Sequence, residues 1–162
     1  MAGQIAYIAL GSNLGKRSDT LAAALAILDE CAGISVLRVS EMVQTTPVGG
    51  PGGQEDYLNG AAEIETSLSP TGLLAALQDI ERKFGRDRAS EQRWGERTCD
   101  LDILLIGDIV VDTPELTIPH PRMHQREFVL APLNEIAAGA VHPVFNKTVS
   151  QLLADLSGGN KT

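Results

Sequence analysis

Residues 100–106 read Asp-Leu-Asp-Ile-Leu-Leu-Ile, and this stretch decides the fold because it is an apolar strand that carries two acidic side chains. The apolar run predicts a buried strand. Successive side chains of a strand point to opposite faces, so Asp100 and Asp102 would share one face, roughly 6–7 Å apart along the chain. Gly107-Asp108 then predicts a turn into a further short strand over 109–111.

A helix is predicted over residues 70–84, upstream of this strand. Ser69 suits the cap and Pro70 the first helical position. Apolar side chains recur at helical spacing on one face, at Leu73, Leu77, Ile80 and Phe84. Gly85 would end the helix. The charged residues 85–95 show no periodicity, so we expect a mobile loop there.

The first half of the chain predicts the same kinds of element. An apolar run over 4–10 predicts the first strand, and a helix capped by Ser18 follows, with Leu21, Leu25 and Leu28 on one face. Residues 34–46 predict a second strand, and the glycine-rich residues 49–53 a flexible loop. Residues 57–64 predict a third strand, although Asn59-Gly60 could instead form a tight hairpin turn.

The C-terminal part predicts a helix from Pro121 to about Ala137, a short helix over 149–156 and a disordered tail over 157–162. We find no repeat or linker and expect a single domain over 1–156. The order βαββαβ predicts an α+β fold, a ferredoxin-like sandwich of an antiparallel sheet with helices packed on it and extra C-terminal helices.

The composition excludes several classes of protein. Apolar residues make up 43% of the 162 residues, which is typical of a globular chain. The net charge of −8 would repel nucleic acid. The only cysteines, Cys31 and Cys99, fit a reducing compartment. The sequence shows no signal peptide and no membrane span, so we expect a cytoplasmic monomer without membrane contact.

Asp100 and Asp102 give the strongest chemical signal. Two carboxylates on one strand face repel each other, and Mg²⁺ compensates such a pair because it prefers oxygen ligands and keeps phosphate oxygens among them. The alternative is a strand end with two solvated aspartates. Six of the 13 basic residues also fall within residues 82–97, so this stretch is net positive. It is either a solvated helix end and loop or a pocket for a small polyanion such as a nucleoside triphosphate.

The remaining motifs are weaker. Residues 11–16 fail as a Walker A loop because three residues, where four are needed, separate Gly11 from Gly15-Lys16. Polymerase-β-like nucleotidyltransferases place Asp-x-Asp shortly after Gly-Ser, unlike this chain. His120 and His124 have a spacing that can bind zinc, but no third ligand is apparent, so we expect His120 to contact phosphate or cap a helix.

Taken together, these stretches resemble one family, the 6-hydroxymethyl-7,8-dihydropterin pyrophosphokinases of folate synthesis. The matching stretches occur in the family's order along nearly the whole chain and are residues 9–15, 46–47, 56–59, 93–104 and 116–120. The resemblance implies that ATP donates a pyrophosphate group to the hydroxymethyl group of the pterin and that AMP is released.

The resemblance also implies the site. Asp100 and Asp102 would hold two Mg²⁺ ions, and Arg93 and Arg97 would neutralise charge during the reaction. The ATP contacts would be Gln78, Glu81, Arg86, Arg88, Arg93, Trp94, Arg97, Ile103, Thr117, His120 and Arg126. The pterin pocket would be Thr46, Pro47, Tyr57, Asn59 and Phe128, with the two aromatic rings on either side of the pterin.

Two other functions remain open from the residues. The chain could be a nucleotidyltransferase acting on another acceptor, or a ferredoxin-like module that binds a ligand without catalysis. The sequence also departs from some relatives, because Glu115 stands where they carry a basic residue and Pro121 and Arg122 alter the segment after His120.

Overall fold

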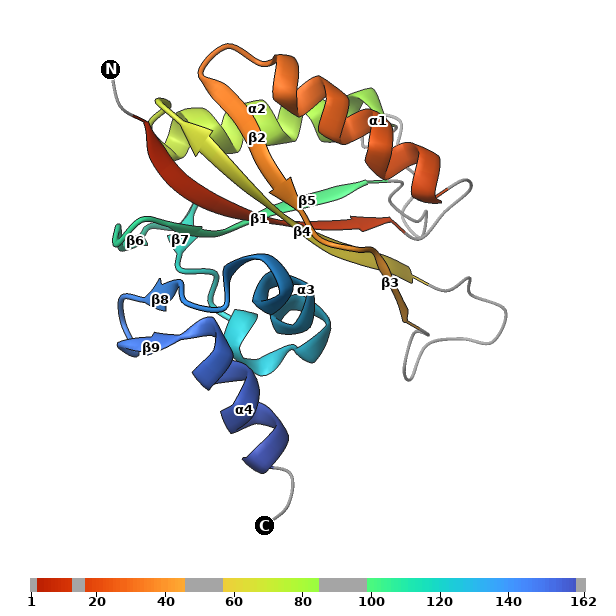
Figure 1. The fold of residues 1–162 in the computed structure, drawn as a ribbon. Helices are drawn as coiled ribbons and strands as arrows, with labels where there is room; N and C mark the ends of the chain where they lie inside the picture. Colours follow the sequence, from red (N-terminus) through yellow and green to blue (C-terminus); the bar gives the residue numbers. More distant parts are fainter. Residues whose placement is uncertain (1–2, 13–16, 46–56, 85–98, 160–162) are drawn as a thin grey trace.

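The computed structural model describes residues 3–12, 17–45, 57–84 and 99–159, which form a central antiparallel sheet covered on both faces (Figure 1). The strand order is β2-β4-β1-β5. The strands are β1 (Gln4–Ser12), β2 (Ile34–Val39), β4 (Tyr57–Thr66) and β5 (Asp100–Ile106), and the short β3 (Val43–Thr45) also pairs with β4.

Two helices, α1 (Arg17–Glu30) and α2 (Pro70–Lys83), lie on one face of this sheet (Figure 1). Helix α1 connects β1 to β2, with β4 between them, and α2 connects β4 to β5, with β1 between them. Two interleaved βαβ units of this kind make a ferredoxin-like fold. The predicted fold is therefore confirmed.

The ends of the two helices test the predicted caps. Ser69 caps α2 as expected, because its Oγ accepts the backbone N–H of Gly72 at 3.1 Å. The prediction for α1 was wrong: the helix begins at Arg17, so Ser18 lies inside its first turn. A serine early in a helical pattern fits either position, because cap geometry and not residue type decides where a helix begins.

Periodicity predicted one strand over 34–46, but the structure breaks it into β2 and β3 at Ser40. The Ser40 Oγ accepts the backbone N–H of Ala61 and donates to the carbonyl of Glu41, both at 2.9 Å. A side chain that bonds to backbone in this way replaces the regular ladder. The partner strand β4 is continuous, so the predicted strand over 57–64 is confirmed and the hairpin turn at Asn59-Gly60 is excluded.

An extra residue interrupts the pairing of β5 with β1. Tyr7 pairs with Leu105 and Ile8 with Ile103, so Leu104 has no partner on β1 and forms a bulge. Gly107 then turns the chain with a positive φ of 50°, as predicted. The strand that follows, β6 (Val111–Asp112), begins two residues later than expected and pairs with β7 (Thr117–Ile118).

The second face of the sheet is covered by the C-terminal residues (Figure 1). They form the 3-10 helix η1 (Met123–Gln125), α3 (Glu127–Ala137), a hairpin of β8 (Val141–His142) and β9 (Lys147–Thr148), and α4 (Val149–Gly159). The prediction of one helix from Pro121 was wrong, because Arg126 has extended backbone and separates η1 from α3. Helix α4 reaches Gly159, so residues 157–159 of the expected tail are helical.

Two hydrophobic cores result, one on each face of the sheet. The first lies under α1 and α2 and includes Ile8, Leu77 and Ile103. The second lies under α3 and α4 and includes Leu104, Leu105 and Leu133. The bulge in β5 explains how Leu104 and Leu105 both reach the second core, because the extra residue resets the alternation of the strand.

Candidate active site

Asp100 and Asp102 leave β5 on the face of the sheet opposite α1 and α2. The residues that alternate with them, Cys99, Leu101 and Ile103, are buried in the core under those two helices. Asp100 is half-buried and Asp102 is exposed. The structure thus places both carboxylates on one face, as the period of a strand predicted.

The register of three strands brings Asn59 into the same row as Asp100. Gly11 of β1 pairs with Asn59 of β4 on one side and with Asp100 of β5 on the other. Neighbouring strands lie about 4.8 Å apart, so about 10 Å separates the Cα atoms of Asn59 and Asp100. Paired residues face the same side of a sheet, and the glycine between them has no side chain to fill the space.

A cleft of about 230 Å³ opens beside Asp102 at the β5 edge of the sheet. Its walls come from α2, β5 and the segment around β7. The residues that line it are Leu74, Leu101, Asp102, Ile103, Pro114, Glu115, Leu116, Thr117, His120 and Pro121. Three predicted ATP contacts, Ile103, Thr117 and His120, are therefore assembled around one predicted metal ligand.

Backbone hydrogen bonds fix His120 at this cleft. Its N–H donates to the carbonyl of Leu104, the bulge residue, at 3.0 Å. Its Nδ1 accepts the backbone N–H of Arg122 at 3.1 Å. Because Nδ1 accepts, the neutral ring carries its proton on Nε2.

Burial lowers the pKa of His120, and the positive charges of Arg126 and Arg122 lower it further, while the charge of Asp102 opposes them. A lowered pKa keeps the imidazole neutral near pH 7. His120 therefore presents a neutral N–H donor rather than a positive charge.

Glu81 lies on α2 and is only 4% exposed. Its Oε2 accepts the backbone N–H of Leu101, the residue between the two aspartates, at 2.8 Å. Gln78, which is predicted to bind ATP with Glu81, is exposed on the same helix. The two side chains therefore have different surroundings, and the burial of Glu81 could not be read from its spacing.

Cys99 precedes Asp100 and is fully buried. Burial, with smaller contributions from the negative charges of Glu81 and Asp100, raises the pKa of its thiol to about 12. The thiol stays protonated at neutral pH, so it does not add a thiolate ligand beside the carboxylates.

Arg126 and Phe128 lie together at the start of α3. The Arg126 guanidinium carbon is 5.8 Å from the centre of the Phe128 ring, and the ring is 42% exposed. Arg126 also acts on the pKa of His120. The structure thus places Arg126, a predicted ATP contact, beside Phe128, a predicted pterin contact.

Part of the predicted site lies outside the described residues, namely Thr46, Pro47, Arg86, Arg88, Arg93, Trp94 and Arg97. Tyr57 is described by its backbone, which pairs with Thr45.

The zinc alternative for His120 and His124 finds no support. The ring of His124 packs edge-on against Phe145, with 4.7 Å between ring centres, while His120 lines the cleft. Among the described residues, no group of three or more His, Cys, Asp or Glu side chains could hold a metal ion.

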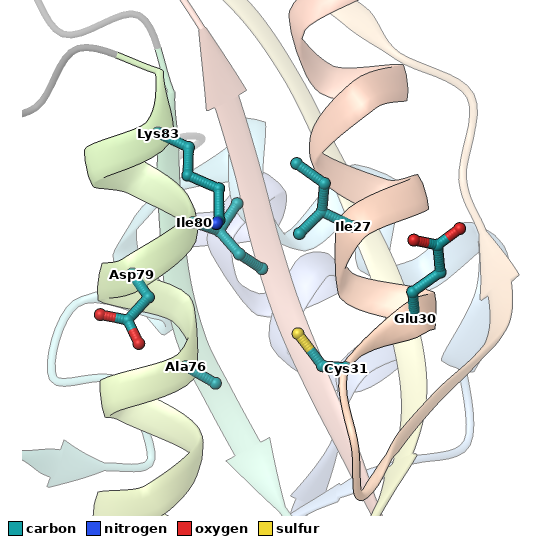
Figure 2. Close-up of a pocket in the computed structure, with 7 residues that line it drawn as sticks. All are labelled: Ile27, Glu30, Cys31, Ala76, Asp79, Ile80 and Lys83. Atoms are coloured by element: carbon teal, nitrogen blue, oxygen red, sulfur yellow. The ribbon is translucent and has the colours of Figure 1, made fainter.

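A second hollow, of about 360 Å³, lies between α1 and α2. Figure 2 shows Ile27 and Ile80 pointing toward each other across it, and Cys31 facing Ala76. Glu30, Asp79 and Lys83 complete its lining. We call this hollow the helix groove. None of its residues was predicted as a site residue.

A family model described as 7,8-dihydro-6-hydroxymethylpterin-pyrophosphokinase (HPPK) matches residues 7–138, which hold both aspartates, Asn59 and His120. The chain belongs to this family. HPPK relatives from Bacillus subtilis and Haemophilus influenzae are both named 2-amino-4-hydroxy-6-hydroxymethyldihydropteridine pyrophosphokinase. The first is 52% identical over 132 residues, which are 82% of this chain and 77% of the relative. The second is 49% identical over 138 residues, which are 85% and 84%.

The HPPK fold also occurs within longer proteins. A solved HPPK-DHPS from Plasmodium falciparum matches with a TM-score of 0.74 at 15% identity, over 98% of this chain and 44% of that one. A further HPPK-DHPS, solved in complex with substrates, gives a TM-score of 0.73 at 14% identity, over 98% of this chain and 44% of that one. At such identities the likeness concerns the fold alone. Within the described residues, no helix is both long and apolar enough to cross a membrane.

Proposed function

We propose that this chain transfers the pyrophosphate group of ATP to the hydroxymethyl group of 6-hydroxymethyl-7,8-dihydropterin and releases AMP, a step of folate biosynthesis. Family membership supports the reaction. The observation that carries it is the row of Asn59, Gly11 and Asp100 across three strands. A pterin held by Asn59 would bring its hydroxymethyl group toward the aspartates over a position without a side chain.

Asp100 and Asp102 would hold two Mg²⁺ ions. The fit is good because both donors are carboxylate oxygens on one face, which suit a hard cation. A pair of carboxylates leaves coordination positions to phosphate oxygens and water, as Mg²⁺ requires in nucleotide enzymes. When bound, Mg²⁺ supplies neutralisation of phosphate charge and a fixed orientation of the reacting oxygens.

The other residues bind and orient the two substrates. His120 would donate its Nε2–H to a phosphate oxygen, and Ile103 and Thr117 would contact the nucleoside in the cleft. Positive charge would come from Arg126 and from the basic residues of the stretch before β5, Arg86, Arg88, Arg93 and Arg97, with Gln78 and Trp94 as further nucleotide contacts.

The pterin would bind on the other side of Gly11. Asn59 is 5% exposed, and its amide offers both donors and acceptors to the edge of the heterocycle. The rings of Tyr57 and Phe128 would lie on its two sides, and Thr46 and Pro47 would complete the pocket.

The reaction forms a bond between the hydroxymethyl oxygen and the β-phosphorus of ATP and breaks the bond from that phosphorus to the oxygen that leaves with AMP. The hydroxyl proton is released to solvent. Such a reaction depends on in-line positioning and charge neutralisation rather than on covalent catalysis. The fixed His120 and the aspartates of β5 provide that positioning.

Incubation with ATP, Mg²⁺ and the pterin alcohol, followed by mass analysis, tests the proposal. We expect AMP and a pterin that has gained a pyrophosphate group. Release of inorganic pyrophosphate with a nucleotide joined to the acceptor would identify a nucleotidyltransferase. Binding of the pterin without consumption of ATP would identify a non-catalytic module. Either result would overturn the proposal.

We also propose that the chain acts as a cytoplasmic monomer. The edge strand β2 carries an irregularity at Leu37, and such interruptions discourage pairing between sheet edges. The two free thiols, Cys31 and Cys99, suit a reducing compartment. Analytical ultracentrifugation at micromolar concentration would detect a dimer, and a dimer would contradict the proposed monomeric state.

A further inference from the structure

Glu81 is a buried carboxylate in an otherwise apolar helix face. Its neighbours on that face, Leu73, Leu77 and Ile80, are at most 1% exposed and pack in the first core. A buried carboxylate is costly unless it accepts hydrogen bonds. An apolar residue would cost less free energy to bury at this position, so we expect the carboxylate to accept hydrogen bonds from a specific donor.

That partner includes the backbone of β5 between the two aspartates. The Oε2 of Glu81 accepts the N–H of Leu101 at 2.8 Å. Strand β5 lies at the edge of the sheet, where alternate backbone groups have no neighbouring strand. The Leu101 N–H is one of these groups, and a charged acceptor binds it more strongly than a neutral one would.

A second backbone contact fixes the same strand on the other side of Asp102. The carbonyl of Leu104, at the bulge, accepts the N–H of His120 at 3.0 Å. Asp102 is therefore bracketed by two hydrogen bonds to the edge of β5, three residues apart. Together they set the backbone direction from which both carboxylates project.

Glu81 approaches the strand from the side opposite the carboxylates. Leu101 packs in the core under α2, whereas Asp100 and Asp102 belong to the other face. Glu81 is not among the described residues that line the cleft beside Asp102. The hydrogen bond to the peptide of Leu101 therefore connects Glu81 to the strand that carries both aspartates.

We propose that Glu81 is a positioning residue, which holds the Leu101 peptide and thereby sets the spacing of the two aspartates for divalent cations. This inference rests on the proposed function, because it takes Asp100 and Asp102 as the metal ligands. It assigns Glu81 a role through the strand, in place of the contact with ATP that the family resemblance implies.

Two substitutions separate the hydrogen bond from the charge. Glu81→Gln keeps an acceptor oxygen of the same reach, and Glu81→Met fills similar space without a strong acceptor. Leu77→Ala, one turn earlier on the same face of α2, is the control for loss of packing alone. Thermal unfolding gives the temperature at which each variant is fully folded.

The measurements are Mn²⁺ affinity by electron paramagnetic resonance, with a non-hydrolysable ATP analogue present, together with kcat and the KM of each substrate. We expect Glu81→Met to lower Mn²⁺ affinity and kcat by about 10-fold or more, as loss of a residue that orients metal ligands does. The KM for the pterin should stay within about 2-fold, since Glu81 lies on the face of the sheet opposite Asn59 and substitutions away from a binding site usually have small effects. Glu81→Gln should recover most of both losses, and Leu77→Ala should leave Mn²⁺ affinity unchanged.

Three results would overturn the proposal. They are a Glu81→Gln variant as impaired as Glu81→Met, a Glu81→Met variant with the Mn²⁺ affinity of the unsubstituted chain, and a change confined to the KM for ATP. If Glu81→Met does not fold, a Glu81→Gln variant with lowered Mn²⁺ affinity and kcat would still overturn the proposal. The unsubstituted chain keeps the two proposals apart: Mn²⁺ binding without AMP release would refute the function and leave the Glu81 comparison readable.

Discussion

The helix groove and the cleft beside Asp102 are both open hollows, but they differ in how their polar groups are held. The groove is the larger, at about 360 Å³ against about 230 Å³. Its polar side chains stand on two solvated helices, and one of them, Asp79, is paired with Arg82 on the same helix. In the cleft, the polar groups belong to a strand and a segment that backbone hydrogen bonds fix in place.

This difference in how the polar groups are held, rather than the volume, favours the cleft as the proposed active site. A catalytic group stabilises a transition state best when its dipole or charge is already oriented. His120 meets that condition through its two backbone contacts, and β5 meets it through Glu81. The Asp79 side chain in the helix groove pairs only with Arg82 among the interactions found in the described residues, and both side chains are largely exposed.

The largest effect expected is loss of turnover when one carboxylate of the cleft is removed. Asp102→Asn should lower the rate of AMP release by about 100-fold or more, because loss of one preorganised electrostatic group typically costs that much. The substitution keeps the size of the side chain. The rate is measured at saturating ATP, pterin and Mg²⁺.

Asp79→Asn is the matched control, because it removes a carboxylate from the helix groove with the same change of side chain. It should leave turnover within about 2-fold, as surface substitutions usually do. Equal losses in both variants would mean that the cleft is no more functional than the groove. Normal turnover of Asp102→Asn would contradict its role as a metal ligand.

A smaller and more selective effect is expected at Asn59, which lies across Gly11 from Asp100 in the row of three paired residues. Asn59→Ala should weaken binding of the pterin by about 10-fold or more, because hydrogen bonds to a buried amide are lost. Binding of ATP should change little, since the aspartates and His120 are untouched. Calorimetric titration of each substrate separates the two effects, and equal losses for both would refute a pterin pocket at Asn59.

The fold and the position of both aspartates on one face of β5 could be predicted from the sequence because they depend on local periodicity. The apolar stripe of α2, its Ser69 cap and the alternation at the start of β5 are each contained in a few residues. The family resemblance then pointed to Ile103, Thr117 and His120, which periodicity alone would not select and which the structure brings into one cleft with Asp102.

The remaining features depend on contacts between distant residues. The break between β2 and β3 follows from a bond between Ser40 and Ala61, and the pattern of residues 34–46 carries no sign of it. The burial of Glu81 depends on a bond to Leu101, 20 positions away. The row of Asn59, Gly11 and Asp100 exists only once three strands are in register.

The smallest effect is expected from chemical modification within the helix groove. Cys31 is partly exposed there, whereas Cys99 is fully buried in the first core and its thiol pKa is raised to about 12, mainly by burial. Iodoacetamide should therefore alkylate Cys31 in the folded chain and reach Cys99 only on unfolding, because the thiolate is the reactive form. Peptide mass analysis identifies the modified residue.

The chain alkylated at Cys31 should keep its turnover within about 2-fold, since none of the residues that line the groove is proposed to contact a substrate or a metal ion. Saturating ATP or pterin should not slow the alkylation. Protection by either substrate, or loss of activity in step with the modification of Cys31, would join the groove to the active site. The contrast between the two hollows would then have to be explained by coupling through α2, which contributes residues to both linings.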